Sequence, residues 1–212
     1  MPRTADIAAL GSLAVVSAVT AAVYSRLPEQ VATHFDIHGD ADAYMPKAAA
    51  SVLLPALGLG VWALVRFAPR VLPRTERERL GPTTIPLVGA MIAAFVAIIH
   101  VAVLAVALRP GVSIMKVVWL AMGALFVALG LIMPRLRRNP IVGVRTAWTL
   151  TSDETWARTH RVAGYTMVAS GLVAALAGAF GGVAGTVVAI VSVLLGSLVP
   201  AVYSLVLARR GS

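Results

Sequence analysis

The chain has 212 residues, of which 59% are hydrophobic and 13% are charged; its mean hydropathy is +0.88 and its net charge +9. A soluble domain carries about 25% charged residues, so this chain has too few charges to cover a water-facing surface. The composition therefore indicates a membrane protein. The absence of cysteine excludes disulfides, thiolate zinc sites and cysteine nucleophiles. The positive charge suits cytoplasmic loops, and without a basic soluble domain we expect no direct nucleic-acid partner.

Six apolar stretches follow one another along the chain. Each is close to the roughly 20 residues that cross about 30 Å of hydrocarbon as a helix. They run over Ile7–Tyr24, Ala48–Phe67, Ile85–Leu108, Ile114–Met133, Val162–Phe180 and Val183–Leu207. Because the bilayer offers the backbone no water, all six are expected to be helical. The predicted fold class is an all-α membrane protein with six transmembrane helices.

The basic residues divide unevenly between the two sides that these helices define. Fourteen of the 18 lysines and arginines lie in one alternating set of segments. The other set holds Arg26, Lys47, Arg109 and Lys116. Since short loops rich in Lys and Arg stay in the cytoplasm, both termini are predicted to be cytoplasmic. The loop at 26–47 then faces outside, and the loop at 134–161 faces the cytoplasm.

The outer loop carries acidic residues and histidines at every second position. The alternating residues are His34, Asp36, His38, Asp40 and Asp42. In an extended segment they share one face, and His34, Asp36, His38 and Asp42 would suit Zn²⁺ or Mn²⁺, the one cofactor that the pattern suggests. Gly39 favours a polar turn instead, in which Asp36 caps the turn, Asp42 pairs with Lys47 and His34 packs on the membrane face. Direct contact with a peptide ligand is the third interpretation.

A single histidine, His100, falls well inside the third apolar stretch. Ionisable residues at this depth are costly and mark functional sites by default. The alternative interpretation is a neutral histidine that hydrogen-bonds across helices.

The cytoplasmic loop contains signals for a capped helix. "TSDE" at Thr151–Glu154 has the form of a capping box, with Thr151 as the cap, so a helix is predicted to begin near Ser152 and to continue into the fifth span. On this helix the pairs four residues apart are Glu154 with Arg158 and Trp156 with His160.

Before the cap, Pro140 and Gly143 predict a turn that projects Arg145 and Thr146 towards the bundle. The alternative is a plain interfacial anchor, in which Arg145, Arg158 and Arg161 bind anionic head groups of membrane lipid. No carboxylate pair, Ser/His/Asp order or glycine-rich phosphate loop indicates catalysis in this segment.

The segment from Asn139 to Gly164 closely resembles the signature of the SdpI family of bacterial membrane proteins. The matching residues are Asn139, Pro140, Gly143, Arg145, Thr146, Thr149, Leu150, Ser152, Glu154, Trp156, Thr159, His160, Arg161 and Gly164. The outer loop resembles the short extracytoplasmic module that often precedes this region. Its matching residues are Leu27, Pro28, His34, Phe35, Asp36, Gly39, Asp42 and Lys47.

The two resemblances imply a domain organisation and a function. Residues 1–80 form a two-helix module with the outer loop, and residues 81–212 form the four-helix SdpI-like region. The resemblance implies a non-enzymatic protein of the bacterial cytoplasmic membrane that protects against a secreted antimicrobial peptide toxin. In the founding system such a protein also recruits a cytoplasmic transcriptional repressor, so that partner is expected as well.

On this basis the outer ligand-binding residues would be His34, Phe35, Asp36, Gly39, Asp42 and Lys47. The first alternative is a small metal-binding transporter or a metal-dependent membrane enzyme, with the metal at the outer loop and His100 along a polar path. A structural membrane protein with lipid-binding loops is the second.

Overall fold

The computed structural model describes the chain except residues 1–2, 75–76, 78–79, 81–83, 110 and 211–212. The long helices are α1 (Arg3–Val23), α2 (Lys47–Phe67), α4 (Thr84–Leu108), α5 (Ile114–Ile132), α7 (Asp153–Phe180) and α8 (Gly182–Arg210). The short elements are the single turns η1 (Tyr24–Arg26), η2 (Ala68–Val71) and η3 (Met133–Arg135), the strands β1 (Gln30–Phe35) and β2 (Ala41–Pro46), and helix α6 (Ala147–Thr151). Among the described residues, six helices are long and apolar enough to cross a membrane, which confirms the predicted fold class.

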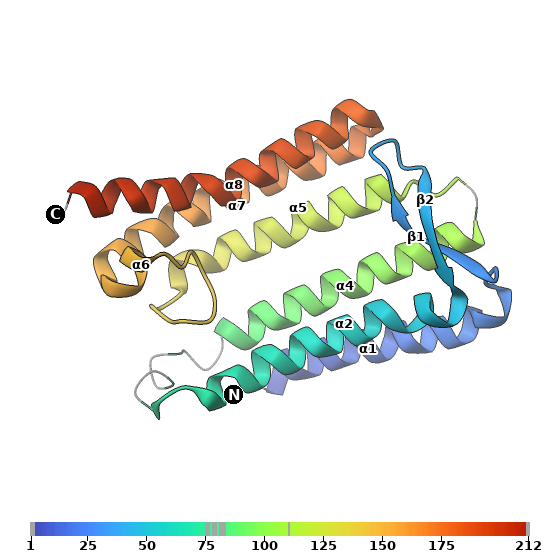
Figure 1. Cartoon of the computed structure of the whole chain (residues 1–212), viewed down its shortest axis with the longest axis horizontal. Coiled ribbons are helices and arrows are strands. Elements are labelled where there is room, and N and C mark those ends of the chain that lie inside the picture. Colours follow the sequence, from blue (N-terminus) through green and yellow to red (C-terminus); the bar gives the residue numbers. More distant parts are fainter. Residues whose placement is uncertain (1–2, 75–76, 78–79, 81–83, 110, 211–212) are drawn as a thin grey trace.

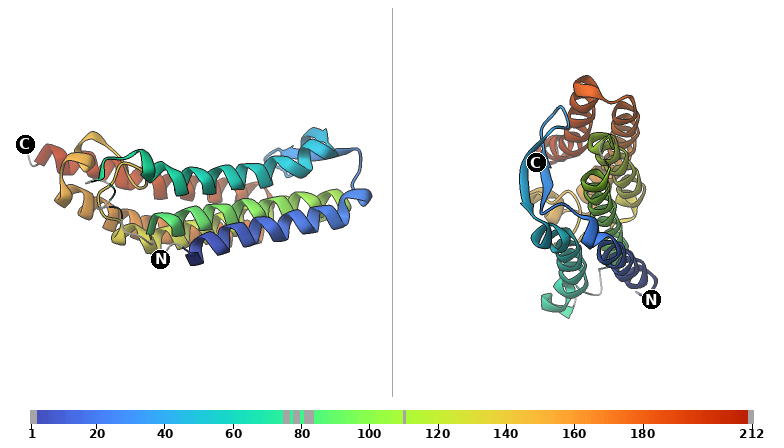
Figure 2. Two further views of the ribbon diagram at one scale, coloured as in Figure 1. Left: turned by 90° about the horizontal axis from the view of Figure 1, so that it is seen from below. Right: turned by 90° about the vertical axis from the view of Figure 1, so that its right-hand side faces the viewer.

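The six long helices form two groups of three. In the first group α4 packs against both α1 and α2, which contact each other much less. In the second group α7 packs against both α5 and α8. Figures 1 and 2 show the groups side by side, and the contact between α4 and α5 joins them.

Helices α5 and α7 approach each other closely because glycines face each other at their crossing. A Cβ atom on Gly123 would lie 2.5 Å from the carbonyl oxygen of Gly171, and one on Gly171 would lie 2.6 Å from that of Gly123. Any side chain at either position would push the two backbones apart. Small residues at helix contacts are a common means of association in membranes, where hydrophobic burial drives helix pairing only weakly.

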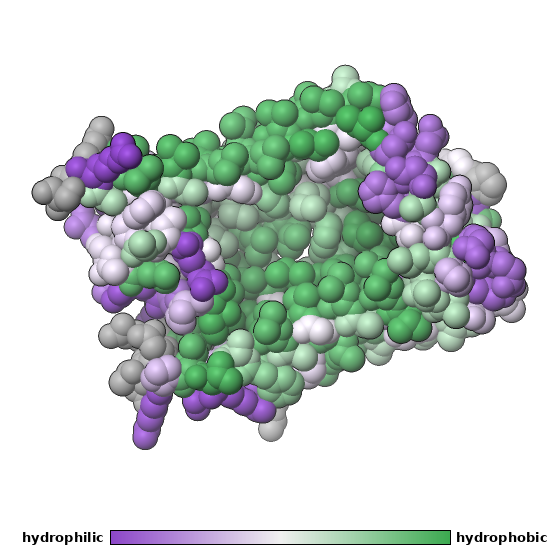
Figure 3. Space-filling view, viewed as in Figure 1, coloured by the Kyte–Doolittle hydropathy of each residue, from purple (hydrophilic) through white to green (hydrophobic). Residues whose placement is uncertain are grey.

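The surface between the two ends of the bundle is apolar. Large hydrophobic side chains such as Leu57, Leu64, Leu176 and Leu194 are more than half exposed. Figure 3 shows apolar residues over the middle of the molecule and hydrophilic residues gathered at its two ends. A water-soluble monomer rarely exposes so large an apolar surface, so this band is the part that the lipid covers.

The loop after α1 folds into a hairpin that sequence analysis did not specify. β1 and β2 pair antiparallel, with irregular register between Ala32 and Phe35. Leu27 and Val31 are buried in one cluster with Val103 and Leu104 of α4 and Ile114 of α5. The hairpin is therefore seated on the ends of α4 and α5, at the opposite end of the bundle from α6 (Figure 1).

Both termini lie at the end of the bundle that carries α6 (Figure 1). This placement agrees with an even number of spans, and the distribution of basic residues predicts that this end is cytoplasmic. Since the chain has no cysteine, single cysteines can report sidedness directly. We expect a membrane-impermeant maleimide to label Ala43→Cys in intact cells and Arg137→Cys only after lysis. The reverse pattern would contradict the predicted orientation.

Candidate functional site

The outer hairpin is organised by Asp36 at its turn. One carboxylate oxygen of Asp36 accepts from the backbone N–H groups of His38, at 2.8 Å, and Asp40, at 3.0 Å. Gly39 follows with a φ of 91°, a conformation in which glycine carries no steric penalty. These contacts confirm the interpretation in which Asp36 caps a tight polar turn.

Two further pairs of ionisable side chains cross the hairpin. His34 Nδ1 lies 2.5 Å from Asp42 Oδ1, and both side chains are largely exposed. Lys47 Nζ lies 2.7 Å from a carboxylate oxygen of Glu29. The predicted pairing of Asp42 with Lys47 is therefore wrong. Backbone pairing explains the difference, because the Lys47 N–H donates to the Glu29 carbonyl and brings those two side chains together.

The arrangement does not assemble the predicted metal-ligand set. Within the described part of the chain, no group of three or more His, Asp or Glu side chains is placed to hold a metal ion. Of the four predicted ligands, His34 and Asp42 meet, while Asp36 turns its carboxylate to the backbone of the turn. The two-residue periodicity fails as a guide because the chain reverses direction at Gly39, so the alternating residues do not share one extended face.

The hydrogen bond from the Asp40 N–H, helped by that from His38, holds the pKa of Asp36 below its ordinary value. Because the pKa of Asp36 is lower in the folded state, its ionised form stabilises the turn at every pH above the ordinary pKa of an Asp side chain. This stabilisation is lost as the pH falls through the lowered value.

His100 is fully buried between α4 and α1. Its Nε2 lies 2.9 Å from the hydroxyl oxygen of Thr20, which itself donates to the Val16 carbonyl. The ring therefore joins two helices, as the cross-helix interpretation predicted. Within the described residues its Nδ1 has no hydrogen-bond partner.

At the opposite end, Asn139 shapes the start of the loop that is predicted to be cytoplasmic. Its side-chain oxygen accepts from the N–H groups of Ile141 and Val142, both at 2.8 Å. Its amide nitrogen donates to the carbonyls of Arg137 and Val142. All these groups belong to the loop itself, so buried Asn139 stabilises the turn and has no capacity left for a ligand.

His160 attaches this loop to α7. The Trp156 carbonyl can only accept, so Nδ1 of His160 carries the proton and donates to it at 2.9 Å. Nε2 then accepts from the backbone N–H of Val144 at 3.0 Å. Both bonds form together only in the neutral ring. The Trp156 ring stacks on the imidazole, with centroids 3.9 Å apart, and its own Nε1 donates to the Leu136 carbonyl at 2.7 Å.

Gly143 makes this attachment sterically possible. Its φ is 123°, and a Cβ atom there would overlap Nε2 of His160. Glycine is therefore required twice, by the backbone conformation and by the imidazole beside it. The name "His160 lock" is used below for Gly143, Val144, Trp156 and His160 with these hydrogen bonds.

Two threonines cap the short helix α6. The Thr146 hydroxyl accepts from the Thr149 N–H, and the Thr149 hydroxyl accepts from the Thr146 N–H, which makes a capping box. The predicted box at Thr151–Glu154 is wrong, because the Thr151 hydroxyl donates backwards into α6. Ser152 caps α7 instead and accepts from the Thr155 N–H, so the predicted helix start near Ser152 is confirmed.

The signature residues divide into a buried set and an exposed set. Asn139, Thr149, Trp156, Thr159 and His160 are buried, whereas Arg145, Glu154 and Arg161 are exposed. Arg145 does not project into the bundle as predicted. Its neighbour Val144 packs with Trp156, and in extended backbone the next side chain points the other way.

The predicted helix-surface pair is present, since Arg158 lies 3.3 Å from Glu154. Arg145 and Arg161 of the signature are exposed, and so is Arg158 between them.

Sequence analysis missed several contacts that hold the loop in place. Arg138 binds Asp153 at 2.6 Å and the Leu150 carbonyl at 2.5 Å. Trp148 donates from Nε1 to the Ser204 hydroxyl at 2.7 Å and so ties α6 to α8. No local pattern relates Trp148 to a serine 56 residues later. In the sequence, Arg138 looks like any other arginine of a loop predicted to be cytoplasmic.

The fold and these two polar ends define a multi-pass α-helical membrane protein with a folded loop on each side. Residues 135–204 match the model of the SdpI/YfhL protein family, and residues 12–59 match a domain of unknown function, DUF1648. These two matches confirm the predicted resemblance of the C-terminal region to the SdpI family, with a separate module before it. No curated protein and no solved structure matches it. The family match confirms the predicted bacterial plasma-membrane protein.

The His160 lock predicts that one added methyl group at Gly143 lowers the stability of the protein. Gly143→Ala should destabilise the protein by about 1–3 kcal/mol from backbone strain alone, before any overlap with His160 is counted. Gly60→Ala is the matched control, because a Cβ atom there meets nothing within 4 Å. We expect thermal unfolding in detergent to show a lower Tm for Gly143→Ala only. Equal Tm values for both variants would contradict the lock.

The turn at Asp36 predicts that the hairpin loosens only at acidic pH. A spin label on Ala43→Cys should keep the same mobility from neutral pH to about pH 4, then loosen below that as Asp36 is protonated. Asn keeps an acceptor oxygen without titrating, so Asp36→Asn should remove most of this transition and leave the neutral spectrum unchanged. A transition that persists unaltered in Asp36→Asn would assign it to other groups.

Proposed function

We propose that this protein is a non-enzymatic immunity and sensing protein that meets a secreted antimicrobial peptide with its outer hairpin. The match to the SdpI/YfhL family model supports a membrane immunity-type role in general. The toxin contact and the relay to the cytoplasm are the more specific parts of this proposal. The observation that carries them is that one helix, α5, contacts the outer hairpin at its start and the cytoplasmic loop at its end.

The outer end of this connection lies at the hairpin tip. A Cβ atom on Gly39 would be in van der Waals contact with Met115, in the first turn of α5. The hairpin also displays Ile37, 41% exposed, and Tyr44, 58% exposed. Two exposed hydrophobic side chains on a rigid polar hairpin form a suitable contact for an amphipathic peptide, with His34 and the acidic residues around them.

The inner end lies just beyond α5. Pro134 packs against Gly164 of α7, where a Cβ atom would lie 2.8 Å from the proline ring. Gly164 is one turn after His160, so a shift of α5 would press directly on the helix that carries the lock. We propose that peptide binding at the hairpin shifts α5 and changes the surface on which Arg145 and Arg161 are exposed. A ligand can produce such a change only if it binds the two conformations with different affinity.

The expected cytoplasmic partner is a repressor that carries acidic side chains. Arg145 and Arg161 are exposed, and neither forms an ion pair with any residue that the structure describes. Their charges are therefore available to a protein surface or to lipid head groups. Arg158 is less available, because it is engaged by Glu154 and Tyr203.

The metal-dependent alternative has weaker support. The four outer ligands do not converge, and His100 is held by Thr20 between helices, without a chain of further ionisable groups among the described residues of α4. A conduit or a metal-assisted reaction needs such groups to be near one another.

The proposal is tested by survival of peptide-sensitive cells that express variants at matched membrane levels, challenged with a sporulation-delay-type peptide. We expect the wild type to protect and Ile37→Ser/Tyr44→Ser to lose most protection, because peptide contact is removed from an exposed surface. Ala43→Ser, also on the exposed hairpin, is the control and should protect fully. Protection by the double variant equal to that of wild type would overturn the hairpin contact. No protection by the wild type would overturn immunity to that peptide.

A second comparison separates protection from signalling. Arg145→Ala/Arg161→Ala should keep protection and lose recruitment of a fluorescently tagged cytoplasmic repressor to the membrane. Loss of protection in this variant at normal membrane levels would show that the arginines serve immunity itself.

A further inference from the structure

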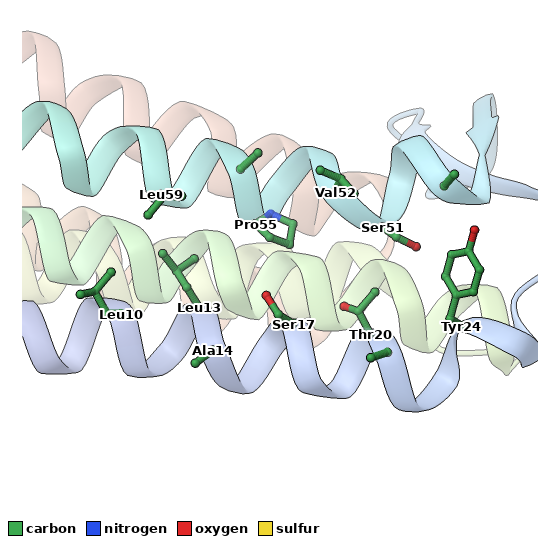
Figure 4. Close-up of a pocket in the computed structure, with 13 residues that line it drawn as sticks. Leu10, Leu13, Ala14, Ser17, Thr20, Tyr24, Ser51, Val52, Pro55 and Leu59 are labelled. Atoms are coloured by element: carbon green, nitrogen blue, oxygen red, sulfur yellow. The ribbon is translucent and has the colours of Figure 1, made fainter.

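The N-terminal group of helices contains a cleft that the proposed function does not use. It encloses about 830 Å³ between α1 and α2. Figure 4 shows the side chains of the two helices facing each other across it. Leu13, Ser17 and Thr20 line it from α1, and Ser51, Pro55 and Leu59 line it from α2. Nearly all of these wall positions fall within the DUF1648 match.

The cleft is closed at both ends and open along its side. At the end near the termini, Asp6 of α1 accepts from Trp62 of α2 at 3.0 Å and lies 3.4 Å from Arg66. At the hairpin end, Lys47 lies over the Tyr24 ring, 5.4 Å from its centroid. Between these two contacts, α1 and α2 pack against α4 and make few contacts with each other. Because both walls are membrane spans, the open side faces lipid.

One level of the cleft is polar although its surroundings are apolar. The Ser51 hydroxyl is buried and has no hydrogen-bond partner among the described residues. Pro55 has no N–H to give to the Ser51 carbonyl, which therefore lacks its ordinary helical donor. Such groups are costly in a bilayer unless a partner reaches them. Thr20 faces this level from α1, with His100 behind it.

The length and the lining of the cleft suit hydrocarbon chains. The walls extend from Leu10 to Tyr24, about 20 Å at 1.5 Å per residue. Most of its lining side chains are apolar, and its open side faces the lipid, as a site for acyl chains requires.

We infer that this cleft binds an anionic glycerophospholipid. The acyl chains lie along Leu10, Leu13 and Leu59, and an ester carbonyl accepts from the Ser51 hydroxyl, about 6 Å below the start of α2. The phosphate then lies at the base of the hairpin, where Arg26 and Lys47 stand against the single acid Glu29, while Asp36 and Asp40 lie at the far tip. The inference is independent of the immunity role and assigns a ligand to the DUF1648 region.

The test uses the full-length protein in nanodiscs made mainly of phosphatidylcholine. Trace phosphatidylglycerol or phosphatidylcholine with a photoreactive acyl chain is added, and cross-linked peptides are mapped. We expect phosphatidylglycerol to label α1 and α2 around the cleft preferentially. Ser51→Ala should reduce that labelling by about two- to tenfold, the equivalent of one hydrogen bond.

A filling variant provides the sharper comparison. Ala56→Trp places a large ring in the cleft and should remove most of the labelling there. Ala169→Trp makes the same change in a groove between α7 and α8 and should leave it intact. Equal Tm values for the two variants would show that both are folded.

Even labelling of all lipid-facing helices, or labelling unaffected by Ala56→Trp, would overturn the site. Equal labelling by the two lipids would overturn its preference for an anionic head group, and displacement by an apolar peptide alone would overturn lipid as the occupant.

Discussion

The end of the bundle that carries α6 depends on one neutral imidazole. His160 donates to the Trp156 carbonyl and accepts from the Val144 N–H, so a single ring joins α7 to the loop that precedes α6. Gly143 leaves room for that ring, and Trp156 covers its face. A charged imidazole would set its Nε2–H against the Val144 N–H, two donors facing each other, and the loop would separate from the helix. The exposed arginines keep their positions because this buried contact holds.

Elsewhere in the bundle several polar side chains also join separate helices, which satisfies them in surroundings that offer no water. Thr20 meets His100 between α1 and α4, Asp6 meets Trp62 between α1 and α2, and Trp148 of α6 meets Ser204 of α8. These groups join helices and do not line a path, which is why a role built on surfaces and helix shifts suits the fold better than transport. Ser51, like Trp119 and Thr159, has no hydrogen-bond partner among the described residues, and its place in the cleft is the reason to put a lipid beside it.

The spans were predictable because about 20 apolar residues in succession have one solution in a bilayer, whatever their order. The hairpin and the caps were not, because they depend on which of several similar residues is chosen. Thr146 and Thr151 are equally good caps by composition, and the fold selects Thr146 because Thr149 reaches the Val144 carbonyl. Lys47 had several acidic residues within reach, and strand pairing placed Glu29 beside it. Long-range partners such as Trp148 and Ser204 left no local signal.

The state of the His160 ring tests this account most directly. The chain has four histidines, so ¹⁵N side-chain spectra of the protein in lipid are simple, and a His160→Asn variant assigns the signal. We predict a neutral ring protonated on Nδ1 at pH 7, with a coupling from Nε2 across the hydrogen bond to the Val144 amide. A ring protonated on Nε2, or an imidazolium, would contradict the lock and with it the placement of the cytoplasmic loop on α7.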